Sequence, residues 1–210
     1  MEIGLLFGTF NPIHKGHWLI ASCAQEQFAL DKILFITSPN PPHKDDELLD
    51  PKARYEMVKA ALLGSSYFEA SNIELLRDGP SYTIDTVEEL EKTYPADTRF
   101  NLILGEDNLL QLDTWHRAFD IAKKCRILVA PRAAQAPHSV HTPQEHLVEL
   151  SSEAKEMQAK LPGLDVQAIN FAGIHLSSTQ VRENIKLGLP VEAFLPEAVA
   201  RIVTQRGYYK

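Results

Sequence analysis

G-T-F-N-P-I-H-K-G-H occupies residues 8–17, directly after an apolar run from Ile3 to Phe7 and before an amphipathic stretch that begins near Lys15. This order predicts a buried strand, a glycine loop and the first turn of a helix. Gly8 permits a sharp exit from the strand, which brings backbone N–H groups close to a ligand. A helix N-terminus adds unpaired N–H groups and partial positive charge. The loop is therefore predicted to hold phosphate, with His14 and His17 facing one anion.

The residues that follow extend this segment into a βαβ unit. Residues 15–30 place apolar side chains on one helical face, and Lys32 to Ile36 follows as a second buried strand. Parallel strands joined by a helix end at the same edge of the sheet, where ligands bind in such proteins. Taken alone, the glycine loop is also compatible with a tight turn that carries two surface histidines.

Composition sets the broad class. A chain of 210 residues, 44% hydrophobic, can bury a sizeable core, and one α/β domain over 1–210 is expected. The net charge of −7 gives no general footprint for nucleic acid. Cys23 and Cys125 are too few for a disulfide framework or a zinc site. The sequence has neither an apolar run approaching ~18 residues nor a signal sequence, so we expect a cytoplasmic protein without a membrane segment.

Further elements follow from capping residues and apolar patterns. Asp50 and Pro51 predict the start of a helix that runs to about Leu63, and Thr142 begins a capping box for a helix to about Leu161. Ser81 is the expected cap of a helix that reaches about Thr93. Residues 67–76 are weakly strand-like. Other strands are predicted at 100–104, at 126–130 and, at an edge of the sheet, at 166–170, with a last helix at 196–206.

A second polar segment, L-S-S-T-Q-V-R, occupies residues 176–182. Ser177 and Gln180 have the spacing of a capping box, so a structural interpretation is a helix start with Arg182 pointing into water. Consecutive hydroxyls at a helix N-terminus, with a guanidinium one turn on, can equally form a phosphate clamp.

These motifs together resemble those of a known superfamily. Residues 8–17 match the G-x-F-x-P-x-H-x-G-H signature of the nucleotidylyltransferases, and residues 176–182 resemble its I-S-S-T-x-x-R signature, with apolar replacements at Leu176 and Val181. Three further runs are typical of the bacterial nicotinate-mononucleotide adenylyltransferases: N-P-P-H-K at 40–44, P-S-Y-T-I-D-T at 80–86, and L-G-x-D-N-L at 104–109 followed by Trp115. The resemblance covers residues 2 to about 209.

The resemblance implies a Rossmann-like, doubly wound α/β fold, with a mostly parallel sheet flanked by helices and a small helical part at about 176–210. It implies transfer of AMP from ATP to nicotinate mononucleotide, which yields deamido-NAD and pyrophosphate in NAD synthesis, by direct in-line attack. Mg²⁺ is expected to bind mainly through the ATP phosphates, and no protein ligand is assigned to it. ATP and nicotinate mononucleotide are the expected partners, and a homo-oligomer is left open.

The resemblance also assigns residues to parts of the site. The catalytic groups are His14, His17 and Arg182. The residues assigned to binding ATP and its phosphates are Gly8, Thr9, Phe10, Gly16, Ser177, Ser178 and Thr179. The acceptor nucleotide is assigned to Lys44, Thr83 and Trp115, and its ribose region to Gly105 and Asp107. Asp107 could equally cap a short helix, and Arg117 could be a cationic donor or a solvated side chain.

Two other functions are considered. Pantetheine-phosphate adenylyltransferases and glycerol-phosphate cytidylyltransferases carry the two superfamily signatures but lack the three further runs. A catalytically silent nucleotide-binding module would keep the fold, although the presence of His14, His17 and Arg182 argues against it.

Overall fold

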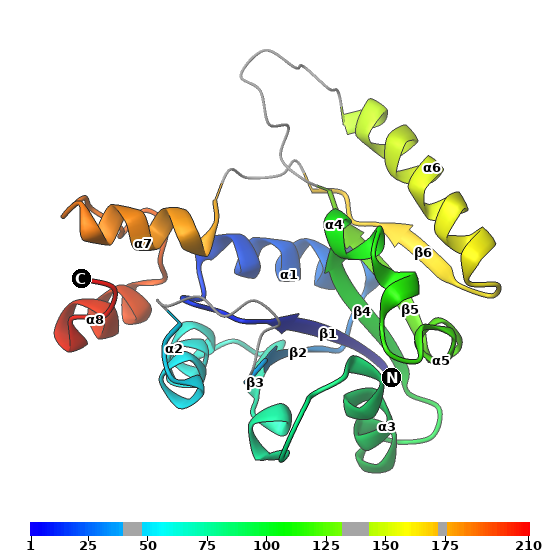
Figure 1. Cartoon of the computed structure of the whole chain (residues 1–210), viewed down its shortest axis with the longest axis horizontal. Helices are drawn as coiled ribbons and strands as arrows, with labels where there is room; N and C mark the ends of the chain where they lie inside the picture. The colour runs from blue at the N-terminus through cyan, green and yellow to red at the C-terminus, as the bar shows by residue number, and fades with distance from the viewer. Residues whose placement is uncertain (40–47, 132–142, 172–175) are drawn as a thin grey trace. The chain divides into compact units, whose positions relative to one another are not determined.

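The computed structural model describes residues 1–39, 48–131, 143–171 and 176–210 (Figure 1). Its centre is a six-stranded parallel sheet in the order β3-β2-β1-β4-β5-β6, which confirms the Rossmann-like fold. The strands are β1 Glu2–Gly8, β2 Lys32–Thr37, β3 Phe68–Ser71, β4 Arg99–Gly105, β5 Cys125–Ala130 and β6 Asp165–Ala168.

Continuous apolar runs explain the central strands. Leu5 of β1 pairs with Leu102 of β4, which pairs with Ile127 of β5, and all three side chains are fully buried. Such runs suit strands that are covered on both faces. β6 lies at the edge, as predicted, and its side chains alternate between exposed and half-buried. The weak pattern at 67–76 is divided between the short β3 and a 3₁₀ helix, Ile73–Leu76.

Most helices lie close to the predicted positions, whereas α5 was not predicted. They are α1 Lys15–Phe28, α2 Pro51–Leu62, α3 Thr83–Thr93, α4 Glu106–Leu109, α5 Ala118–Lys124, α6 Pro143–Lys160, α7 Ser178–Lys186 and α8 Glu197–Arg206. Asp50 caps α2 by accepting from the Lys52 N–H (2.9 Å), as expected. None of the described helices is both long and apolar enough to cross a membrane.

Two helix starts differ from the prediction. Tyr82, not Ser81, occupies the N-cap position of α3, and the Ser81 hydroxyl is buried without a partner among the described residues. Asp107 lies within α4, where Gly105 holds the N-cap position, so Asp107 does not cap that helix. In both cases the chain enters the helix one or two residues away from the side chain that could have capped it.

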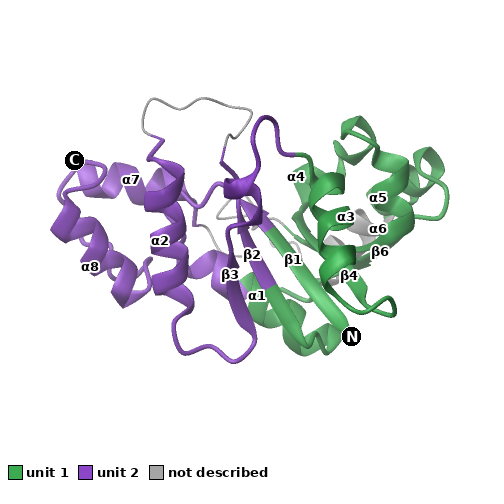
Figure 2. Ribbon diagram, turned by 90° about the horizontal axis from the view of Figure 1, so that it is seen from below, with its two compact units in different colours: residues 1–6, 20–33, 82–175 green, residues 7–19, 34–81, 176–210 purple. Residues whose placement is uncertain are grey.

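The chain divides into two compact units, each built from separate segments (Figure 2). Unit 1 comprises residues 1–6, 20–33 and 82–175, and within it α3 packs against α5 and α6 against β6. Unit 2 comprises residues 7–19, 34–81 and 176–210, and within it α8 packs against α2. The single domain expected from the sequence stays a prediction.

Candidate active site

The glycine loop leaves β1 at Gly8 and turns sharply at Phe10, whose φ is 49°. A Cβ atom at Gly8 would lie 2.6 Å from the Phe10 ring, so a side chain larger than hydrogen would displace that ring. The ring is buried at 2% exposure, edge-on to His17 with 5.1 Å between centroids. The Phe10 side chain therefore supports His17, and only its backbone is left to meet a ligand.

His14 and His17 form a stacked pair at the start of α1. Their ring centroids lie 3.8 Å apart, and the backbone N–H of His14 donates to Nδ1 of the His17 ring (3.2 Å). A neutral His17 must then carry its proton on Nε2. The buried Nδ1 of His14 has no partner among the described residues. The two imidazoles therefore lie side by side, and that they face one anion stays a prediction.

Burial sets the charge of this pair. It lowers the pKa of His14 to about 4, and burial together with the neighbouring His14 lowers the pKa of His17 well below its usual value. Both rings are neutral at pH 7 in this state. They can offer hydrogen bonds to a phosphate, while fixed positive charge must come from another group.

That charge comes from α7, which lies in the same unit as the glycine loop. Ser177 caps α7 by accepting from the Gln180 N–H (3.1 Å), as the capping box predicted. Ser178 Oγ donates to the Pro12 carbonyl (2.9 Å). Arg182 is 6% exposed and its Nη1 donates to the Asn11 carbonyl (3.1 Å), so the solvated alternative for Arg182 is wrong. The two sequence signatures meet in one cluster, with Thr179 exposed beside it.

Arg54 of α2 is a buried residue that binds the same loop, and no sequence pattern had indicated it. Its side chain is fully buried, and its guanidinium donates to the backbone carbonyls of Thr9, Ser38, Pro39 and Leu49. A charged arginine without solvent contact is stable only when its donors are satisfied. Arginines in the first turn of a surface helix are mostly solvated, which is why the pattern alone could not single it out.

Asn11 is a second buried residue of this loop that was not among the predicted site residues. Its side chain is buried, and Oδ1 accepts both from the Leu49 N–H (3.2 Å) and from the Tyr209 hydroxyl (2.9 Å). Its position inside the first signature was the available signal, since a polar residue there lies next to the predicted phosphate loop.

Of the residues assigned to the acceptor and its ribose, Thr83, Trp115, Gly105 and Asp107 lie in unit 1. Thr83 is the first residue of α3 and is half-buried, as is Trp115, which follows the 3₁₀ helix Leu112–Thr114. Their chain neighbours Tyr82 and His116 have ring centroids 4.3 Å apart, so the structure brings the two segments together. Gly105 and Asp107 are exposed at the carboxyl end of β4. Lys44 lies outside the described residues.

Arg117 is exposed, and its guanidinium is already bound by carboxylates. Its guanidinium donates to both carboxylate oxygens of Glu88 (2.7 and 3.1 Å) and to Asp120 (2.7 Å). These hydrogen bonds raise its pKa further above the usual arginine value. Arg117 has a left-handed backbone (φ 55°) at the N-cap position of α5.

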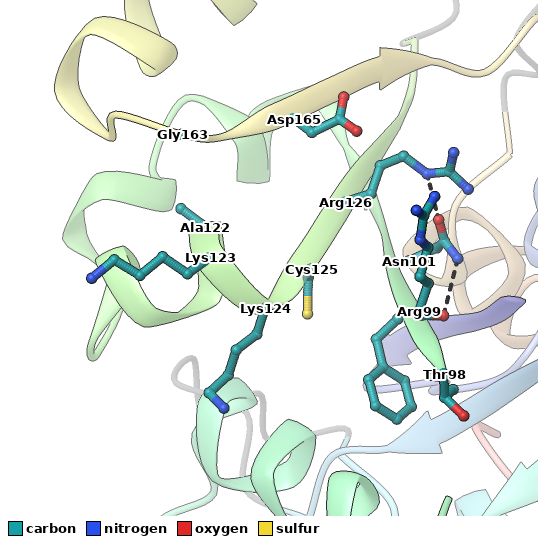
Figure 3. Close-up of a pocket in the computed structure, with 11 residues that line it drawn as sticks. Thr98, Arg99, Asn101, Ala122, Lys123, Lys124, Cys125, Arg126, Gly163 and Asp165 are labelled. Atoms are coloured by element: carbon teal, nitrogen blue, oxygen red, sulfur yellow. Dashed lines mark hydrogen bonds between the residues drawn. The ribbon is translucent and has the colours of Figure 1, made fainter. Parts of the chain in front are cut away.

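A cavity of about 370 Å³ lies in unit 1 at the amino ends of β4, β5 and β6 (Figure 3). Its lining includes Arg126 and Lys124, but Arg126 is paired with Glu2 (3.0 Å) and Lys124 with Glu91 (2.7 Å). Figure 3 also shows Arg126 donating to Asn101. Ligands of such sheets bind beyond the carboxyl ends of the strands, whereas this cavity lies at the amino ends of β4 and β5. It contains none of the predicted site residues.

Among the described residues, no group of three or more histidine, cysteine, aspartate or glutamate side chains could hold a metal ion. A Mg²⁺ ion that keeps its waters and binds through phosphates would not need such a cage.

Comparison with known proteins gives one consistent result. The cytidylyltransferase-like family model matches residues 5–184. A probable nicotinate-nucleotide adenylyltransferase of Dehalococcoides mccartyi is 38% identical over 212 residues, which cover 100% of this chain and 97% of the relative. A relative of the same name from Thermoanaerobacter is 34% identical, covering 100% and 95%.

Solved structures agree on the fold. The Plasmodium falciparum nicotinic acid mononucleotide adenylyltransferase complexed with NaAD superposes with a TM-score of 0.73 at 14% identity, covering 99% of this chain and 97% of that one. The same enzyme complexed with APC gives a TM-score of 0.71, covering 99% and 96%. With both signatures joined in one cluster and full-length relatives above 30% identity, the chain belongs to the nicotinate-nucleotide adenylyltransferases of the cytidylyltransferase-like family.

Proposed function

We propose that this protein transfers AMP from ATP to nicotinate mononucleotide, forming deamido-NAD and releasing pyrophosphate in NAD synthesis. The observation that carries the proposal is the contact between the two signatures: Arg182 of α7 donates to Asn11 of the glycine loop. The names of the full-length relatives support the same reaction.

The reaction needs no covalent enzyme intermediate. A phosphate oxygen of the acceptor attacks the α-phosphorus in line, a new P–O bond forms, and the bond to the bridging oxygen breaks as pyrophosphate leaves. Negative charge grows on the nonbridging oxygens and on the leaving group, so the site must supply hydrogen bonds and positive charge. Arg182 supplies the fixed charge, and the neutral imidazoles of His14 and His17 supply hydrogen bonds.

The remaining assignments complete the ATP side. Backbone groups at Gly8, Thr9, Phe10 and Gly16 and the hydroxyls of Ser177 and Thr179 are proposed to meet the nucleotide and its phosphates. Ser178 donates to the Pro12 carbonyl, so its hydroxyl contributes by fixing α7 to the loop. Mg²⁺ is proposed to bridge phosphate oxygens and neutralise their charge.

On the acceptor side we propose Lys44, Thr83 and Trp115, with Gly105 and Asp107 at the ribose. Nicotinate mononucleotide carries a carboxylate where nicotinamide mononucleotide carries an amide, and a carboxylate only accepts hydrogen bonds. A preference for nicotinate therefore requires hydrogen-bond donors. The Thr83 hydroxyl and backbone N–H groups after Trp115 are the proposed donors, and the indole is proposed to stack on the ring. We further propose that the chain acts as a single domain in the cytoplasm, without nucleic acid.

The decisive experiment measures pyrophosphate release with Mg²⁺ and ATP against a panel of acceptors. We expect kcat/KM to be about ten- to a hundredfold higher for nicotinate than for nicotinamide mononucleotide, because a hydrogen bond to a charged group contributes about 1.5–3 kcal/mol. Equal values would refute the nicotinate preference. Activity only with pantetheine phosphate, or with glycerol phosphate and CTP, would assign another branch of the family, and no release with any acceptor would indicate a silent module.

A further inference from the structure

Tyr209 contacts the glycine loop although 198 residues separate it from Asn11. Its hydroxyl donates to Asn11 Oδ1 at 2.9 Å, and both residues are buried, with 8% of Tyr209 and 4% of Asn11 exposed. Nothing in the proposed reaction requires a phenol at this place. The question is what a buried tyrosine at the end of unit 2 does for the loop.

The turn that ends α8 leads directly to Tyr209. Gly207 adopts the left-handed conformation (φ 63°), and the N–H groups of Gly207 and Tyr208 donate to the Thr204 and Val203 carbonyls. Tyr209 is itself left-handed (φ 65°), which is unfavourable for a residue with a side chain and persists where the surroundings hold it. Burial of the Tyr209 side chain and the hydrogen bond from its hydroxyl to Asn11 hold it in this conformation.

Asn11 links this hydroxyl to the catalytic arginine. Its Oδ1 accepts from Tyr209 and from the Leu49 N–H, and its carbonyl accepts from Arg182 Nη1 at 3.1 Å. The orientation of the Asn11 peptide therefore sets where the Arg182 guanidinium is held. Burial raises the pKa of Tyr209, against the opposing effect of Arg182 and Arg54, so the hydroxyl remains a donor at neutral pH.

We propose that Tyr209 is a positioning residue of the adenylyl-transfer site: its hydroxyl fixes Asn11, and through Asn11 it fixes Arg182 and the glycine loop, without touching substrate. The proposal rests on the proposed function in one respect, namely that Arg182 binds the triphosphate. It goes beyond that function in adding the last turn of unit 2 to the catalytic apparatus.

The test compares Tyr209→Phe with Tyr208→Phe as a matched control. Both remove one hydroxyl from adjacent tyrosines, but only the Tyr209 hydroxyl bonds Asn11. We expect the KM for ATP to rise about five- to tenfold in Tyr209→Phe, the loss of one hydrogen bond, with the KM for nicotinate mononucleotide unchanged at saturating ATP. Tyr208→Phe should stay within twofold of wild type. A smaller folded fraction would lower kcat and leave both KM values unchanged, so a purely structural role would not give this pattern.

A double-substitution cycle identifies the route. In an Asn11→Ala background, adding Tyr209→Phe should change the KM for ATP by less than twofold, because the acceptor of the hydroxyl is already gone. A full five- to tenfold effect in that background would overturn the proposal, as would a KM for ATP within twofold of wild type in Tyr209→Phe alone.

Calorimetric titration with ATP in the absence of acceptor separates this proposal from the reaction itself. A wild type that binds ATP but forms no pyrophosphate with nicotinate mononucleotide would reject the proposed function, while a weaker Kd in Tyr209→Phe would still support positioning by Tyr209. Unchanged affinity in Tyr209→Phe under those conditions would overturn the positioning role, and a wild type that binds no ATP would overturn both.

Discussion

The glycine-loop region of unit 2 and the Thr83–Trp115 region of unit 1 differ in how their polar groups are held. In the first, Asn11, Arg54 and Arg182 are buried, and each donates to or accepts from backbone of another segment. In the second, Thr83 and Trp115 are half-buried, and the nearby Arg117 forms ion pairs at the surface. Phosphate chemistry requires fixed geometry, whereas the choice of acceptor can rest on a few side chains. Changes in the first region should therefore alter folding and rate, and changes in the second should alter only selectivity.

Arg54→Met should produce the largest effect. It removes the donor of four backbone carbonyls, of Thr9, Ser38, Pro39 and Leu49, and leaves them unsatisfied in the interior. We expect the free energy of unfolding to fall by about 3–5 kcal/mol, measured by urea denaturation at pH 7. Arg201→Met is the control, since Arg201 is exposed and pairs only locally with Glu197 (2.8 Å). A loss of unfolding free energy in Arg54→Met no greater than in Arg201→Met would contradict a stabilising role for the four Arg54 hydrogen bonds.

His14→Ala and His17→Ala should mainly affect the rate. Each removes a hydrogen-bonding group proposed to meet charge that develops in the transition state, and loss of one such donor costs about 3–4 kcal/mol in other enzymes, a few hundredfold in kcat. Single-turnover rates with nicotinate mononucleotide, together with melting curves, would measure the two effects separately. Near-wild-type turnover in both variants would return the histidines to a structural role.

The same pair makes unfolding sensitive to acid. His14 has a pKa of about 4 in the folded protein against about 6.5 when unfolded, so the unfolded chain binds more protons between these values. The contribution of neutral His14 to the free energy of unfolding is fully present above pH 6.5. It is lost as the pH falls towards 4, by up to about 3 kcal/mol. His14→Gln cannot titrate, so its unfolding free energy should fall less than that of wild type between pH 7 and pH 5. Parallel curves for the two proteins would contradict the low pKa.

The smallest expected effect lies in the acceptor region. Thr83→Val removes a hydroxyl proposed to donate to the nicotinate carboxylate, and the preference over nicotinamide mononucleotide should fall about tenfold while stability changes little. Thr93→Val is the matched control on the same helix, because the Thr93 hydroxyl donates to the Leu90 carbonyl at the other end of α3. If both substitutions leave the ratio of kcat/KM values unchanged, Thr83 does not contact the pyridine carboxylate.

Local rules predicted most of the elements. Asp50 with Pro51 and Ser177 with Gln180 marked two helix starts correctly, because a cap is decided by residues within one turn. The same rule failed at Ser81, where Tyr82 holds the N-cap position although it makes no side-chain capping bond. An N-cap side chain contributes about 0.5–2 kcal/mol, which is small enough for tertiary packing to override.

The candidate site was predicted only in part, for a physical reason. The signature residues at 8–17 and 176–182 could be identified from their types and spacing, whereas Arg54 and Tyr209 act through partners that are distant in sequence. A buried guanidinium and a solvated one have the same letter in a sequence. Arg182 illustrates this, since its two interpretations differed only in whether the helix packed against the loop.

The contacts that join α7 and α8 to the glycine loop have a consequence for the order of folding. Three hydrogen bonds, from Ser178 to Pro12, from Arg182 to Asn11 and from Tyr209 to Asn11, span 166, 171 and 198 positions. Closing loops of this length costs chain entropy before the contacts return any energy, so such contacts form late. During refolding from urea, helical circular dichroism should recover before the ability to bind ATP. Simultaneous recovery of the two signals would contradict this order.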